Sequence, residues 1–106
     1  MIITTTSHIP SKKIVKTFGL VRGNTIRTRH IGKDIMAGLK NLMGGEILQY
    51  TKLMAESREQ SLDRMRAEAT RLGANAVVST RFATSQVMGT AAELLAYGTA
   101  VWVEDE

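Results

Sequence analysis

The chain has 106 residues, a formal net charge of +4 and no cysteine, which suits one domain with a modest core and excludes disulfides, thiolate metal sites and thiol catalysis. Its first residues lack the basic and apolar regions of a signal peptide, and no stretch approaches the ~20 apolar residues of a membrane span. We therefore expect a single cytoplasmic domain over residues 1–106, with no membrane partner.

The N-terminal part of the chain favours β-structure. Residues 2–6 are β-branched and predict a short strand. Residues 11–29 alternate between two faces, and one face collects Ile14, Lys16, Phe18, Leu20 and Arg22. Two forms stay open for this segment: a hairpin that turns at Gly23-Asn24, or one long strand with a glycine bulge.

The strongest helical pattern covers residues 46–72. Its apolar positions follow a 3-4-3-4 spacing, at Leu62, Met65, Ala69, Leu72 and Ala76. Gly73 stands where a residue with positive φ ends a helix. At ~1.5 Å per residue, a helix of this length is roughly 40 Å long, which exceeds what a small sheet covers. A weaker helical pattern, interrupted by Gly32 and Gly38, covers residues 31–43.

The last third of the chain predicts two strands, over residues 75–82 and 93–103, with Gly89 in the connection. Both faces of the final strand are apolar, with Leu95, Tyr97, Thr99, Val101 and Val103 on one and Leu94, Ala96, Gly98, Ala100 and Trp102 on the other. A lone two-layer αβ chain leaves one sheet face wet, so this pattern predicts cover from another copy of the protein.

Five motifs follow one another along most of the chain: Gly44-Gly45-Glu46-Ile47, Tyr50-Thr51, Arg58 with Arg64-Met65, Leu72-Gly73-Ala74-Asn75-Ala76-Val77, and the run from Glu93 to Val101. Together they resemble the YbjQ-like family, whose mostly bacterial members have no assigned function and carry the label "putative heavy-metal-binding". The resemblance implies an α+β, dodecin-like β-α-β-β subunit with two layers, an antiparallel sheet and one long helix. It also implies assembly into a homopentameric ring. Ser79 departs from the family pattern, which favours glycine or a small apolar residue there.

The metal-ligand inventory is poor for a heavy-metal site. Soft metals prefer thiolate and imidazole, and the chain offers two histidines, His8 and His30. His30 follows the basic Arg27-Thr28-Arg29, which disfavours a cation nearby. We assign no metal ligand within the single chain, whereas a site shared between subunits escapes this argument.

Six residues are candidate ligand contacts: Glu46, Tyr50, Arg58, Arg81, Glu93 and Tyr97. Glu93 and Tyr97 share one face of the last strand, and Arg81 lies on the preceding strand. Either Arg81 and Glu93 form a structural cross-strand pair, or these residues form a ligand site. An enzymatic alternative uses Glu93 as acid or base with Arg81 and Tyr97. No nucleophile elbow, phosphate loop or dinucleotide fingerprint is present, so we assign no catalytic residue.

Charge is divided unevenly along the chain. Residues 1–46 hold eight Lys/Arg and two acids, and residues 47–106 hold six Lys/Arg and eight acids. Such a division fits an anionic partner or two complementary sides of a self-association surface. A basic-surface nucleic-acid binder is a further alternative, disfavoured because no stacking platform or reader motif appears. The sequence thus predicts a cytoplasmic homo-oligomeric binding or scaffold protein, with a small-ligand or metal site at subunit interfaces and the cofactor left open.

Overall fold

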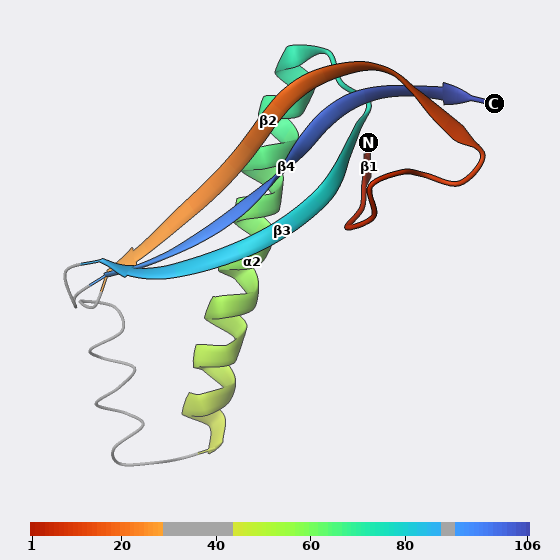
Figure 1. Cartoon of the computed structure of the whole chain (residues 1–106). Helices are drawn as coiled ribbons and strands as arrows, with labels where there is room; N and C mark the ends of the chain where they lie inside the picture. The colour runs from red at the N-terminus through yellow and green to blue at the C-terminus, as the bar shows by residue number, and fades with distance from the viewer. Residues whose placement is uncertain (29–43, 88–90) are drawn as a thin grey trace.

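The computed structural model describes residues 1–28, 44–87 and 91–106, and among these the side chains of residues 1–26, 52, 54–85 and 93–106. In chain order its elements are β1 (Ile2–Ile3), β2 (Lys12–Thr28), α2 (Gly44–Leu72), β3 (Ala76–Val87) and β4 (Ala91–Asp105). The architecture is α+β: the strands form one sheet of order β1-β3-β4-β2, and α2 crosses one face of it (Figure 1). The helix expected over residues 31–43 and the connection at Gly89 lie outside the described residues.

The sheet is mixed rather than purely antiparallel. The three long strands β2, β4 and β3 pair antiparallel, as expected. The short strand β1 instead runs parallel to β3, with Ile2 opposite Ala76. Most of the domain separates these two strands in sequence, which supplies the long crossover connection that parallel pairing needs.

The segment from Lys12 to Thr28 is one long strand, not a hairpin. It pairs with β4 over its whole length, so Gly23-Asn24 continues the strand instead of turning. A bulge lies between Thr17 and Gly19, and Gly19 has a φ of 108°. The extra residue interrupts the simple alternation, so that Phe18 packs beside the buried cluster under α2, whereas Leu20 is exposed.

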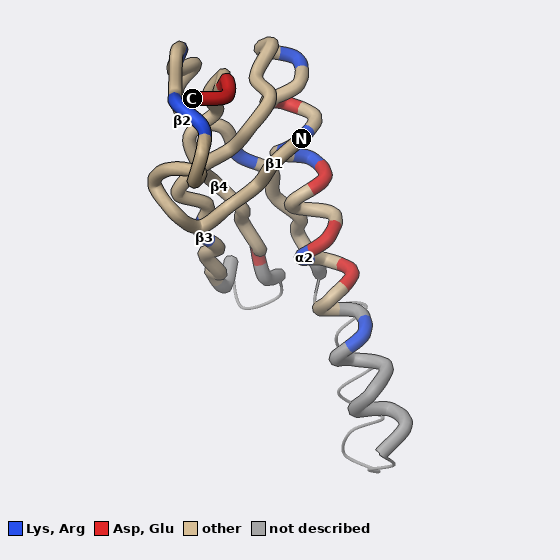
Figure 2. Tube along the Cα trace, turned by 90° about the vertical axis from the view of Figure 1, so that its right-hand side faces the viewer, with Lys and Arg blue, Asp and Glu red and all other residues tan. Residues whose placement is uncertain are grey.

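Helix α2 packs on the sheet through residues spaced four apart, namely Ser57, Ser61, Met65 and Ala69, all 0% exposed. Two expected stripe residues, Leu62 and Leu72, are only partly buried at the edge of this contact. Gly73 ends the helix with a φ of 94°, as the sequence predicts. Acidic residues are spaced along the described part of α2 (Figure 2). No described helix is long and apolar enough to span a membrane.

Strand β3 also contains a bulge, between Val78 and Arg81. At this bulge Ser79 adopts a φ of 55°, a conformation that favours glycine. This is the position where the family pattern favours glycine or a small residue, and the backbone gives the physical reason. The Ser79 amide donates to the Thr6 carbonyl at 2.8 Å, so the bulge also holds the N-terminal segment against the sheet.

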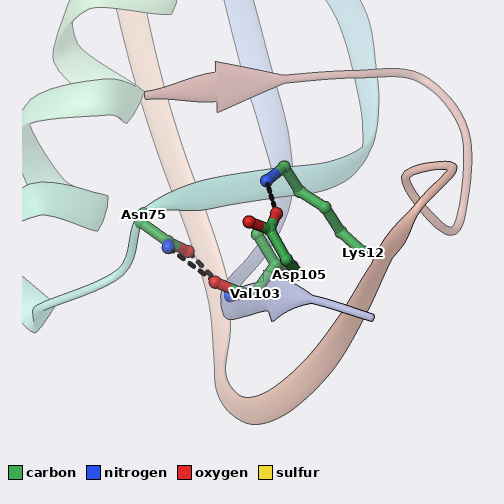
Figure 3. Close-up of polar contacts among 4 residues, drawn as sticks. All are labelled: Lys12, Asn75, Val103 and Asp105. Carbon is green, nitrogen blue, oxygen red and sulfur yellow. Dashed lines mark hydrogen bonds and ion pairs between the residues drawn. The ribbon is translucent and has the colours of Figure 1, made fainter.

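Side chains hold the C-terminal end of β4 to the residue just before β3 and to the first residue of β2 (Figure 3). Asn75 donates to the Val103 carbonyl at 2.9 Å and accepts from the Val103 amide at 2.8 Å, which imitates a strand partner. Lys12 Nζ lies 2.7 Å from Asp105 Oδ1. This hydrogen bond, and then the positive charge of Lys12, lower the pKa of Asp105 below its ordinary value of 3.8.

Candidate functional site on the open face of the sheet

Strand β4 presents its two apolar faces to different surroundings. Leu94, Ala96, Gly98 and Ala100 are buried on the side of α2. On the other side, Val101 and Val103 are buried in a second cluster against which Ile9 packs. The rest of that side is only half-buried on β4. Over this part of the sheet the described residues leave one face of the strand without full cover, as the sequence predicts.

We call this uncovered surface the open face, and the strand register defines it. It comprises Leu20, Arg22, Asn24 and Ile26 on β2, Glu93, Leu95, Tyr97 and Thr99 on β4, and Arg81, Ala83 and Ser85 on β3. Leu20 is 66% exposed and Ile26 is 57% exposed, both far above what a buried apolar side chain shows. A face with apolar side chains this exposed is typical of an interaction surface.

One row across the open face carries two positive charges. Arg22 and Arg81 each lie opposite Tyr97, on the two strands that flank β4. Paired residues in neighbouring strands project from the same side of a sheet, so both arginine side chains leave their strands on the side of the Tyr97 ring. Two strand spacings of ~4.8 Å separate the Cα atoms of Arg22 and Arg81 by roughly 10 Å.

The guanidinium of Arg81 is held by backbone atoms. Its Nη1 donates to the carbonyls of Thr5 and Thr80, each at 2.8 Å. The expected structural pair of Arg81 with Glu93 is therefore wrong for this chain. Register gives the reason, because Arg81 lies opposite Tyr97, whereas Glu93, four residues before Tyr97 on β4, lies opposite Ser85.

Glu93 binds neutral side chains from both neighbouring strands. Asn24 Nδ2 donates to Glu93 Oε2 at 3.0 Å, and Ser85 Oγ donates to Oε1 at 3.4 Å. Four residues of strand place Glu93 roughly 13 Å from Tyr97 along β4. This geometry does not assemble Glu93, Arg81 and Tyr97 into one acid–base site.

The remaining candidates do not join this group. Arg58 is exposed on α2, across the sheet from the open face. Glu46 and Tyr50 belong to α2, but their side chains lie outside the described residues. Sequence reasoning missed Arg22 and Asn24 as members of the face. The sequence shows their even spacing. It does not show which β4 residues they pair with, because that register depends on the bulge beside Gly19.

The described donor residues do not fit a heavy metal bound by one chain. Within the described residues, no three side chains of His, Asp or Glu come together as metal ligands. His8 is exposed in the N-terminal segment, and His30 lies outside the described residues. Three or four ligands are the usual minimum for a tight site, and the described residues of one chain do not supply them.

Comparison with known proteins gives close relatives over the whole chain. The sequence profile of the YbjQ family, described as "Putative heavy-metal-binding", matches residues 1–104. A UPF0145 protein of Archaeoglobus fulgidus is 56% identical over 101 residues, which cover 95% of this chain and 94% of that one. A UPF0145 protein of Dehalococcoides mccartyi is 55% identical over 104 residues, covering 98% of this chain and 100% of that one.

The fold also has a solved counterpart. A crystal structure of a protein of unknown function, from the DUF74 family of Pediococcus pentosaceus, superimposes with a TM-score of 0.64. The match covers 98% of both chains at 16% identity, so it supports the fold alone. Because the family profile matches almost every residue and the relatives exceed half identity over nearly their whole length, this chain belongs to the YbjQ (UPF0145) family.

Proposed function

We propose that this protein is a homo-oligomeric binding or scaffold protein that self-associates through the open face and holds a small ligand or metal between subunits. The observation that carries the proposal is the exposure of Leu20 and Ile26 on the open face. The same face also holds Leu95 and Tyr97, which are only half-buried. Complete burial of a Leu or Ile side chain contributes about 1.5–3 kcal/mol, so covering two well-exposed ones favours association by a few kcal/mol.

The form of association follows from charge. If two copies packed their open faces together about a two-fold axis, the Arg22 and Arg81 rows would approach each other with like charge. A contact between the open face and a different surface of the next copy avoids this repulsion. Such head-to-tail contacts close into rings when the rotation permits. A ring of five subunits, which the family resemblance implies, is the form we propose.

The length of α2 is a second support. Among its described side chains the first buried one is Ser57, whereas the helix begins at Gly44. In Figure 1 the first turns of α2 extend beyond the strands of the sheet. Helical turns that extend past the sheet offer a natural contact for a neighbour, since most helical stability in proteins comes from packing.

Sedimentation velocity and native mass spectrometry of untagged protein test the proposal. The wild-type chain should sediment as a closed oligomer at micromolar concentration, whereas Leu20→Glu should shift it toward a folded species of 11.6 kDa. Leu20 is exposed in the subunit, so the added carboxylate is harmless until a neighbour buries it. Val15→Glu is the matched control, because Val15 lies on the same strand, is 48% exposed and lies outside the open face.

Two outcomes decide the matter. An oligomer that dissociates with Leu20→Glu but persists with Val15→Glu supports self-association through the open face. A wild-type protein that stays monomeric at micromolar concentration defeats the proposal. Native spectra also report any ligand mass retained per subunit, which identifies a bound metal or small molecule directly.

A further inference from the structure

The side of α2 that faces away from its own sheet carries charge in a fixed order. Spacings of three and four residues place Lys52, Glu56, Glu59 and Asp63 on one side of the helix. All four are exposed, and they lie opposite the buried stripe that includes Ser57. In Figure 2 the strands lie to one side of α2 only. We call the surface of these four residues the outer side of α2.

The open face of the sheet carries the opposite order of charge. Glu93 lies at one end of it, and Arg22 lies opposite Tyr97, roughly 13 Å away along the strands. Neither charge is balanced within the described residues. Glu93 accepts hydrogen bonds only from the neutral side chains of Asn24 and Ser85, and no described carboxylate pairs with Arg22. Covering this face without partners for these charges would be strongly unfavourable.

The two charge orders match in spacing. Lys52 and Glu59 are separated by roughly 10 Å along the helix, at ~1.5 Å per residue. The difference of about 3 Å from the spacing on the open face is within the reach of long Lys, Glu and Arg side chains. We propose that the outer side of α2 in one copy covers the open face of the next copy; this rests on the proposed function and names the second surface of its contact. Glu59 then pairs with Arg22 of the next copy. Lys52 pairs with Glu93 of the next copy.

The same charges fix the direction of the contact. With α2 reversed on the open face, Lys52 would meet Arg22 and two carboxylates would meet at the other end, so both contacts would be repulsive. Every copy therefore contacts the next in one sense, which is the head-to-tail arrangement that a closed ring requires. Arg81 takes no part, because its guanidinium binds backbone carbonyls at the outer edge of β3.

Apolar surface accompanies the charged pairs. A shallow hollow of about 380 Å³ lies along the outer side of α2, and Ala55 is among its lining residues. Ile26, which is 57% exposed, lies opposite Glu93 on the open face. Ala55 is one turn from Lys52, so the contact that brings Lys52 to Glu93 also brings Ile26 to the hollow. The charged pairs set register, and the burial of apolar side chains favours association.

Charge reversal tests this contact, with assembly followed by sedimentation velocity over a series of protein concentrations. Glu59→Arg and Arg22→Glu should each raise the concentration needed for assembly by about tenfold or more, because each brings like charges together. The double variant restores opposite charges and should assemble within about threefold of the wild-type concentration. Lys13→Glu and Glu104→Arg are the matched controls. Both residues are exposed and lie outside the two surfaces, so each change should shift assembly less than twofold.

Circular dichroism checks that each variant keeps the fold, which we expect because both reversed residues are exposed in the subunit. If a reversal unfolds the chain, Glu59→Gln and Arg22→Gln replace it. Neutralising either residue should weaken assembly, and neutralising both should weaken it by less than the product of the two single effects. Independent effects of the two neutral changes would overturn the pairing.

The outcomes separate this contact from the proposed function. Rescue of Glu59→Arg by Arg22→Glu supports the contact. An assembled wild type in which Glu59→Arg has no more effect than Glu104→Arg, or in which the double variant is not rescued, overturns the contact and leaves self-association standing. An anion retained in the native mass spectrum of that wild type would then be the occupant of the open face. A wild type that stays monomeric defeats the proposed function itself.

Discussion

Replacing Gly23 by alanine tests the closest approach between the sheet and α2. A Cβ atom at Gly23 would collide with the Ser61 carbonyl oxygen and the Met65 amide nitrogen, and would lie 2.8 Å from Arg64 Cβ. Two of these three atoms belong to the helix backbone, so no change of side-chain rotamer removes the clash. The whole helix must move away from β2.

The expected cost follows from that movement. Carbon atoms pack best at about 3.5–4.0 Å, so α2 must shift on the order of 1 Å at this point. Met65 and Ala69, both 0% exposed, then lose part of their contact with the sheet. Overpacking of a core costs typically 1–3 kcal/mol, and the rigid obstacle here places Gly23→Ala near 3 kcal/mol. For a domain of this size that lowers Tm by about 12–24 °C.

Urea and thermal denaturation at one fixed protein concentration measure this loss, because self-association would make Tm depend on concentration. Gly19→Ala is the matched control on the same strand. A Cβ there meets nothing within 4 Å, but its φ of 108° imposes backbone strain of about 1–2 kcal/mol. If Gly23→Ala were no more destabilising than Gly19→Ala, the close packing of α2 on β2 would be refuted.

Four further changes probe other parts of the fold. Asn75→Ala should lower the free energy of unfolding, measured in urea, by about 3 kcal/mol, because two backbone groups of β4 lose their partners. Asn75→Asp should lower this free energy by about half as much. Ser79→Gly should raise it by about 0.5–1 kcal/mol, since glycine accepts a φ of 55° without strain; a lower stability would contradict the conformation of the bulge. Glu93→Gln should change it by less than about 1 kcal/mol, because both partners of Glu93 are neutral, whereas a loss above about 3 kcal/mol would indicate an ion pair. The pKa of Asp105 is lowered in the folded state, so its stabilising bond with Lys12 is present above pH 3.8 and lost as the pH falls through the folded pKa. The Tm difference between wild type and Asp105→Asn should therefore vanish below that pH, and a difference that persists in acid would contradict the pairing.

The elements with a strong local pattern could be predicted from the sequence. The helix expected over residues 46–72 is observed as Gly44–Leu72, and Gly73 ends it as expected. The last strand, expected over residues 93–103, is observed as Ala91–Asp105. In both cases the periodicity of the side chains and the terminating residues are close together in sequence, so local information is sufficient.

The sequence left a long strand with a glycine bulge open for residues 11–29, but the local pattern could not fix the position of that bulge, and it gave no sign of the bulge in β3. A bulge inserts one residue and reverses which face each following side chain joins, so Phe18 and Leu20 separate although simple alternation unites them. The family pattern marked Ser79 as unusual, but only the φ of 55° explains why. Register also decides the candidate site: Arg81 lies opposite Tyr97 instead of near Glu93, and that pairing depends on the bulge in β3.

Under the proposed function, the placement of charge on the open face would link assembly to ligand binding. If the face served only to join subunits, apolar residues in place of Arg22 and Arg81 would associate at least as well, because buried cations lose their hydration. The chain instead carries both arginines in one row, flanked by exposed Leu20 and half-buried Leu95. An anion that neutralises this row removes the desolvation penalty and allows the leucines to be covered. Ligand binding and self-association would then stabilise each other.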